Sequence, residues 1–69
     1  MQFYPGDLIE PTNGWNVLNV DSAWMLGTAA HIAIVISVMQ DCDGVFAFFP
    51  EYRRFATVGT ERLGLVLRP

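Results

Sequence analysis

The chain has 69 residues, with seven acidic side chains against four basic ones and a net charge of −3, so it has room for one domain with one small core. It contains no lysine, and because nucleic-acid binding depends on cations that displace phosphate counterions, we expect no nucleic acid among its partners. The lone Cys42 excludes an internal disulfide, which leaves oligomerisation or docking into a larger assembly as the expected reinforcement for so small a core.

We expect neither a signal peptide nor a membrane span. The residues from Met1 to Pro5 include no basic group, unlike the start of a signal peptide. Ala23 to Met39 carries no formal charge, but His31 lies near its middle and a turn sequence follows it. A single cysteine is typical of a reducing compartment, so a cytoplasmic location is expected.

The first predicted strand covers residues 6–11, between a Pro5-Gly6 turn and Pro11. Residues 12–30 then form a connection longer than most loops. Asp21-Ser22, followed by apolar residues and Gly27, indicates either a capped helical turn or the returning arm of a twisted loop.

Residues 31–50 predict a long β-hairpin around which the domain is built. Its first arm is rich in Ile and Val, its turn is Asp41–Gly44, and Gly44 is expected to adopt a positive φ. Strand alternation puts four residues on one face of the first arm: Ile32, Ile34, Ile36 and Val38. With a loop of two or four residues, Val45, Ala47 and Phe49 join them, whereas a loop of three would exchange the faces.

The end of the chain predicts two more strands. Residues 55–58 follow a polar turn, Thr60–Leu63 suits a 3₁₀ turn, and residues 65–67 form the last strand. The expected fold is therefore all-β, a single domain over residues 1–69 with about five strands, a long first loop and one 3₁₀ turn.

This layout resembles the SH3-like barrel, and in particular small proteins of tailed bacteriophages. The pieces that carry the resemblance are Gly6-Asp7-Leu8, Pro50-Glu51-Tyr52 and Glu61-Arg62-Leu63, spread along nearly the whole chain. The resemblance implies a structural or adaptor role rather than a chemistry, in the host-cell cytoplasm or the virion. A fold by itself does not establish a function.

The hairpin face opposite the Ile row is also apolar, and its residues are the candidate interface: Val35, Met39, Phe46 and Phe48. Either the long strand bends, so that both faces are core, or this face buries against another subunit. We favour the interface, and hence an oligomer or assembly subunit with a protein partner.

A second candidate site is an aromatic groove of the kind that binds proline-rich peptides, formed by Tyr4, Trp15, Trp24 and Tyr52. The alternative is that these rings cap the ends of the barrel as core. His31 has no catalytic partner at a meaningful spacing, and Cys42 sits between two carboxylates that disfavour its thiolate. We therefore expect no catalytic residue, no metal and no cofactor. The function predicted is a non-enzymatic subunit, with a peptide-binding adaptor as the alternative.

Overall fold

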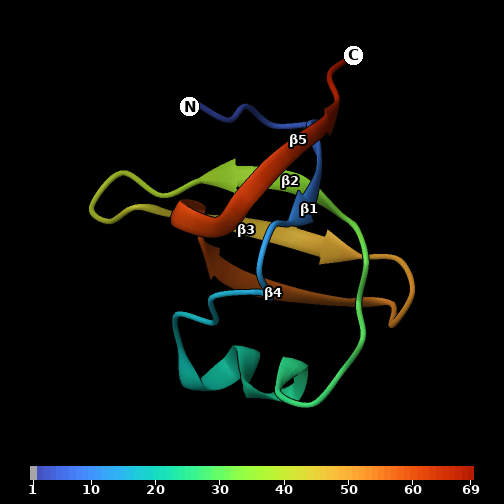
Figure 1. Ribbon diagram of the computed structural model, residues 1–69. Helices are drawn as coiled ribbons and strands as arrows, with labels where there is room; N and C mark the ends of the chain where they lie inside the picture. Colours follow the sequence, from blue (N-terminus) through green and yellow to red (C-terminus); the bar gives the residue numbers. More distant parts are fainter. Residues whose placement is uncertain (1) are drawn as a thin grey trace.

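The computed structural model describes residues 2–69 and shows five strands in one antiparallel sheet (Figure 1). The strands are β1 (Leu8–Pro11), β2 (Ala33–Val38), β3 (Gly44–Phe49), β4 (Arg54–Gly59) and β5 (Leu63–Leu67). They lie side by side in the order β4-β3-β2-β1-β5. The small all-β barrel predicted from the sequence is confirmed, except that residues 2–69 contain two 3₁₀ helices instead of one: η1 (Val20–Met25) and η2 (Thr60–Arg62).

The long first connection contains the helical turn that was one of its two predicted forms. Asn19 caps η1, because its Oδ1 accepts hydrogen bonds from the backbone N–H of Ser22 at 3.1 Å and from the Ser22 hydroxyl at 3.0 Å. Gly27 follows with a φ of 83°, a left-handed conformation that reverses the chain and that glycine adopts without strain. The Asn19 side chain thus defines the start of η1, and the backbone conformation of Gly27 follows its end.

The same connection covers the outer edge of β4. The N–H of Leu18 donates to the carbonyl of Thr57 at 3.1 Å, and the N–H of Gly59 donates to the carbonyl of Asn16 at 2.7 Å. These two bonds flank an isolated antiparallel bridge between Val17 and Val58. The connection therefore acts as a short sixth strand on an edge that would otherwise be open.

Side chains of η1 complete this cover. The Ser22 hydroxyl accepts the N–H of Thr57 at 2.7 Å, and the indole Nε1 of Trp24 donates to the carbonyl of Phe55 at 3.1 Å. Exposed edge strands invite pairing with other chains, and covering them with a loop or helix prevents it. From Phe55 to Gly59, β4 is closed in this way.

The β2–β3 hairpin contains an irregularity that changes which residues face the core. Val38 pairs with Val45, as a regular hairpin predicts, but Ser37 pairs with Phe46 and Val35 with Ala47, so one residue of β2 is extra at Ile36. Because side chains alternate with a period of two, this bulge exchanges the faces of β2 beyond it.

The predicted facing is consequently right for β3 and wrong for most of β2. Val45, Ala47 and Phe49 are buried as expected. Val35, assigned to the exposed face, is in the core at 1% exposure, whereas Ile36, assigned to the core face, is 43% exposed. No local sequence signal announces a bulge of this kind.

Gly44 also differs from its prediction, since its φ is not among the positive ones. It is the first residue of β3, and a Cβ placed there would lie 2.5 Å from Leu18 Cδ1 and 3.3 Å from the Val58 carbonyl oxygen. Glycine is needed here for the close approach of the long connection and β4, not for the shape of the turn.

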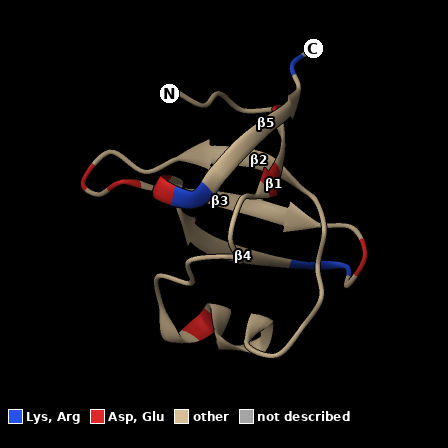
Figure 2. Cartoon of the chain, viewed as in Figure 1, with Lys and Arg blue, Asp and Glu red and all other residues tan. Residues whose placement is uncertain are grey.

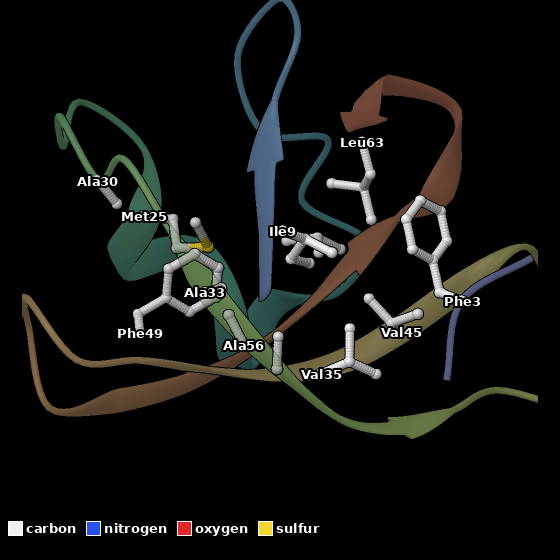
Figure 3. Close-up of a cluster of buried hydrophobic side chains, with 12 residues drawn as sticks. Phe3, Ile9, Met25, Ala30, Ala33, Val35, Val45, Phe49, Ala56 and Leu63 are labelled. Carbon is white, nitrogen blue, oxygen red and sulfur yellow. The ribbon is translucent and has the colours of Figure 1, made fainter. Parts of the chain in front are cut away.

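The core lies on the inner side of the curled sheet (Figure 3). Phe49 is its largest fully buried side chain. Trp15 and Trp24 meet the Phe49 ring edge-on, with centroids 4.8 and 5.7 Å away. Met25 of η1 also reaches the core, so the long connection forms one wall of it. The core residues are Phe3, Ile9, Met25, Ala30, Ala33, Val35, Val45, Ala47, Phe49, Ala56, Val58 and Leu63.

Candidate protein-binding face

The outer side of the sheet carries a row of apolar side chains that crosses all five strands. The register pairs Leu67 with Leu8, Leu8 with Ile34, Ile34 with Phe48, and Phe48 with Phe55. Directly paired residues of antiparallel strands point to the same face and are in contact. We call these five residues the outer row; Leu67 is 63% and Phe55 49% exposed at its two ends.

Three rings gather at the β3–β4 end of this row. Phe46 and Phe55 stack with centroids 5.3 Å apart and planes 4° from parallel, and Phe48 lies 4.9 Å from Phe55. We call Phe46, Phe48 and Phe55 the phenylalanine cluster. Ile36, the extra residue of the bulge in β2, is also exposed.

The part of this face formed by β2 and β3 is free of charge, whereas Glu10 of β1, two residues after Leu8, is exposed on the same side of the sheet. Figure 2 shows the charged residues on the turns, on the 3₁₀ helices, in β1 and near the start of β4, while β2 and β3 are uncharged throughout. Arg54, at the start of β4, is turned away, with its guanidinium 4.9 Å from the centre of the Trp24 ring. An uncharged aromatic surface on an open sheet face is the composition of a protein-binding site's centre.

Of the four predicted interface residues, the structure keeps two together. Phe46 and Phe48 are partly buried neighbours on the outer face. Val35 lies on the opposite, core side. Met39 follows the end of β2 and lines a hollow of about 290 Å³ next to the hairpin loop, together with Phe3, Val38 and Cys42. Cys42 itself is an exposed free cysteine.

Phe55, Leu8 and Leu67 belong to the face but do not follow from the sequence. Each lies in a short strand that contains other apolar residues, so the sequence pattern does not show which of them points outward. The outward position follows from the pairing of each strand with its neighbours. The signal that could have found Phe55 is the short β3–β4 turn, since a fixed hairpin register places Phe55 opposite Phe48.

The aromatic groove is only partly assembled. The Trp15 and Trp24 rings both meet Phe49, and the Tyr52 ring lies 5.5 Å from the Trp24 ring. Tyr4 is elsewhere, because its ring packs under the guanidinium of Arg68 at 4.8 Å.

The polar atoms of the three grouped rings are already used within the chain. Trp15 Nε1 donates to the Ala30 carbonyl at 2.8 Å, Trp24 Nε1 donates to β4, and the Tyr52 hydroxyl accepts the N–H of Ala29 at 3.2 Å. A ligand would find neither indole N–H free. These hydrogen bonds hold the long connection against the barrel.

Two carboxylates tie chain segments together near these sites. Glu51 accepts the backbone N–H of His31 at 2.6 Å through Oε1, and its Oε2 lies 2.9 Å from His31 Nδ1. The hydrogen bond with the His31 ring, followed by the backbone bonds, holds the pKa of Glu51 below its usual range. The pair thus joins the residues before β2 to the β3–β4 turn, and Glu51 is a partner of His31 that the sequence did not indicate.

Asp7 is the second such carboxylate. It is fully buried, accepts Arg68 Nε at 3.0 Å and Nη2 at 2.9 Å, and also accepts the N–H of Tyr4 at 2.8 Å. The hydrogen bonds from Arg68 lower the pKa of Asp7 even though burial acts in the opposite direction.

No protein-family model, curated protein or solved structure matches the chain. Residues 2–69 contain no cluster of three His, Cys, Asp or Glu side chains placed to hold a metal ion. Over the same residues, no helix has the length and apolar character needed to cross a membrane.

Proposed function

We propose that this protein is a non-enzymatic structural or interaction subunit of a larger assembly, and that it binds a protein partner through the phenylalanine cluster. The observation that carries the proposal is the stacking of the half-exposed Phe55 on the partly buried Phe46, with Phe48 beside them. Its resemblance to small tailed-phage proteins suggests the particular form, a virion- or capsid-associated subunit.

The physical argument concerns the cost of leaving such a face in water. Fully burying one exposed phenylalanine side chain contributes about 1.5–3 kcal/mol, and the cluster holds three such rings, each of which is still partly exposed. Aromatic rings at the centre of an interface are frequent hot spots, where truncation costs more than about 2 kcal/mol of binding. Left uncovered, the same patch would promote aggregation. A partner that covers the cluster would gain the free energy of burying these rings and would prevent the aggregation.

The cluster supports this function better than the aromatic groove supports a peptide-binding adaptor. The groove lacks Tyr4, and its indoles donate to backbone carbonyls of the same chain. The side chains of the cluster, in contrast, have no polar atom that needs a hydrogen-bond partner, and Phe55 is exposed to solvent.

The test compares two variants of the chain in the assembly isolated from its natural source. Phe55→Ser removes a ring that is half exposed, and Val20→Ser removes an 85% exposed side chain on η1, away from the cluster. We expect Phe55→Ser to abolish incorporation of the chain while its unfolding temperature stays close to that of the wild type, and Val20→Ser to leave incorporation unchanged. Full incorporation of folded Phe55→Ser would overturn the proposal.

A further inference from the structure

The two ends of β3 differ in charge. Near its first residue, the hairpin loop exposes Asp41 and Asp43, and η2 exposes Glu61 and Arg62. The N–H of Thr60 donates to the Asp43 carbonyl at 2.9 Å, which holds η2 against the loop. Within the described residues 2–69, none of the three carboxylates forms an ion pair. This end of the strand therefore presents three carboxylates and one guanidinium.

The last residue of β3 leads into a turn that carries two arginines. Arg53 and Arg54 follow Glu51, whose carboxylate is already bound to His31. The guanidinium of Arg54 lies over the Trp24 ring, whereas Arg53 is exposed and forms no ion pair within the part of the chain that the structure describes. Figure 2 shows the acidic loop and this turn at opposite ends of β3.

Arg53 has a backbone conformation that a glycine would adopt more easily. Its φ is 55°, in the left-handed region that is unfavourable for any residue with a Cβ. Strained backbone of this kind is concentrated at functional sites, where the side chain has a use that outweighs the strain. An arginine at the tip of an exposed turn, in the conformation that suits glycine, indicates that its guanidinium has a partner outside its own chain.

The hollow of about 290 Å³ beside the hairpin loop has the chemistry to receive such a side chain. Phe3, Val38 and Met39 give it apolar walls, and Asp43 adds a carboxylate. An arginine packs its methylene groups against apolar surface while its guanidinium binds carboxylates, often through two parallel hydrogen bonds. The hollow lies where β2 ends and β3 begins, so it is at the opposite end of β3 from Arg53.

We propose that copies of this chain bind head to tail, with Arg53 of one copy in the hollow of the next. The charges of the two surfaces are complementary, and each copy carries both surfaces. Because the surfaces lie at opposite ends of β3, one copy contacts two different neighbours, and the contact repeats into a ring or an open chain of copies. The contact does not use the phenylalanine cluster, so it is independent of the function proposed above.

The test measures the mass of the purified chain by sedimentation velocity from micromolar to millimolar concentration at low salt. We expect species larger than a dimer, which dissociate as salt is raised towards about 1 M, where exposed charges are screened beyond about 3 Å. Arg53→Glu and Asp43→Arg each place like charges in the contact and should weaken association more than about tenfold. Asp21→Arg, the same change of charge at an exposed site on η1, should leave association unchanged.

A second measurement mixes the two charge-reversed variants. Arg53→Glu retains the acidic hollow and Asp43→Arg retains the arginine turn, so the mixture should associate although each variant alone is monomeric. Misfolding of a variant cannot produce such a recovery. A wild type that is monomeric at all concentrations, a wild-type species that stops at two copies, or a mixture that stays monomeric would each overturn the head-to-tail contact.

Discussion

Asp7 and Arg68, which are 61 residues apart, form a two-point ion pair that fastens the end of the chain to its first turn. Both carboxylate oxygens of the buried Asp7 are used, and Arg68 also donates to the Gln2 carbonyl at 3.0 Å. The guanidinium lies over the Tyr4 ring. This pair holds the end of the chain, just after β5, against the turn that precedes β1.

The first prediction is that Asp7→Asn removes a stabilisation that depends on pH. The pKa of Asp7 is lowered in the folded protein, so the unfolded chain takes up a proton first as the pH falls. The stabilisation is therefore complete above the unfolded value of about 3.9 and disappears as the pH falls through the lower folded value. Urea unfolding at several pH values should show a difference between wild type and Asp7→Asn at pH 7 that shrinks towards pH 2. A constant difference would contradict the ion-pair role.

The second prediction separates the two faces of β3. Phe49→Ala removes a fully buried ring between Trp15 and Trp24 and should cost about 3–5 kcal/mol of unfolding free energy. Phe48→Ser removes a partly buried ring and should cost about 1.5 kcal/mol or less, the lower end for burying phenylalanine. Thermal unfolding of both variants checks the order, and a chain that tolerates Phe49→Ala better than Phe48→Ser would invert the assignment of faces.

The third prediction concerns the contact between Gly44 and Leu18. An alanine Cβ at Gly44 would collide with Leu18 Cδ1, and overpacking of this kind costs about 1–3 kcal/mol. Since Leu18 is 41% exposed, Leu18→Ala alone should have a small effect. In the double variant the loss should be smaller than the sum of the single losses by at least about 0.5 kcal/mol. Additive losses in a double-mutant cycle would show that the Val58 carbonyl, and not Leu18, sets the limit.

The fourth prediction is that Arg53→Gly stabilises the protein. Among residues 2–69, Arg53 is the one non-glycine residue with a positive φ, 55°, a conformation that costs an L-residue about 1–2 kcal/mol. The greater flexibility of an unfolded glycine offsets part of the gain, so we expect about 1 kcal/mol or less in denaturant unfolding.

Gly27→Ala is the reciprocal control for Arg53→Gly, because it places a Cβ at a second position with a positive φ. Its φ is 83° and nothing lies within 4 Å of the added Cβ, so the loss, about 1 kcal/mol, would come from the backbone conformation alone. If Arg53→Gly destabilised the chain while Gly27→Ala behaved as expected, the Arg53 side chain would have a role beyond its backbone.

Part of the candidate site could be predicted from the sequence alone. Phe46 and Phe48 alternate with Val45, Ala47 and Phe49, and local alternation suffices to separate the two sets, as their burial confirms. Val35 could not be placed in this way, because a one-residue bulge at Ile36 reverses the faces. The bulge is a shift in the pairing of β2 with β3, and the alternation of residues along β2 alone does not reveal it.

The aromatic residues illustrate the same limit. Four rings suggested one groove, but whether rings meet depends on the path of the long connection. That path brings Trp15 and Trp24 to Phe49, with Tyr52 beside Trp24, and leaves Tyr4 with Arg68. Residue type indicated that these side chains would be at least partly covered, and it did not indicate by what.

The sequence by itself determined the all-β class, the approximate positions of the five strands, the hairpin at the centre and the inward set of β3, because strand propensity, alternation and turn residues act over a few neighbouring residues. Only the tertiary structure decided which side of β2 is core, that Phe55, Leu8 and Leu67 extend the apolar face, and that the long connection closes the β4 edge. Those features arise from cross-strand register and from the packing of the long connection on β4, which join residues far apart in the chain.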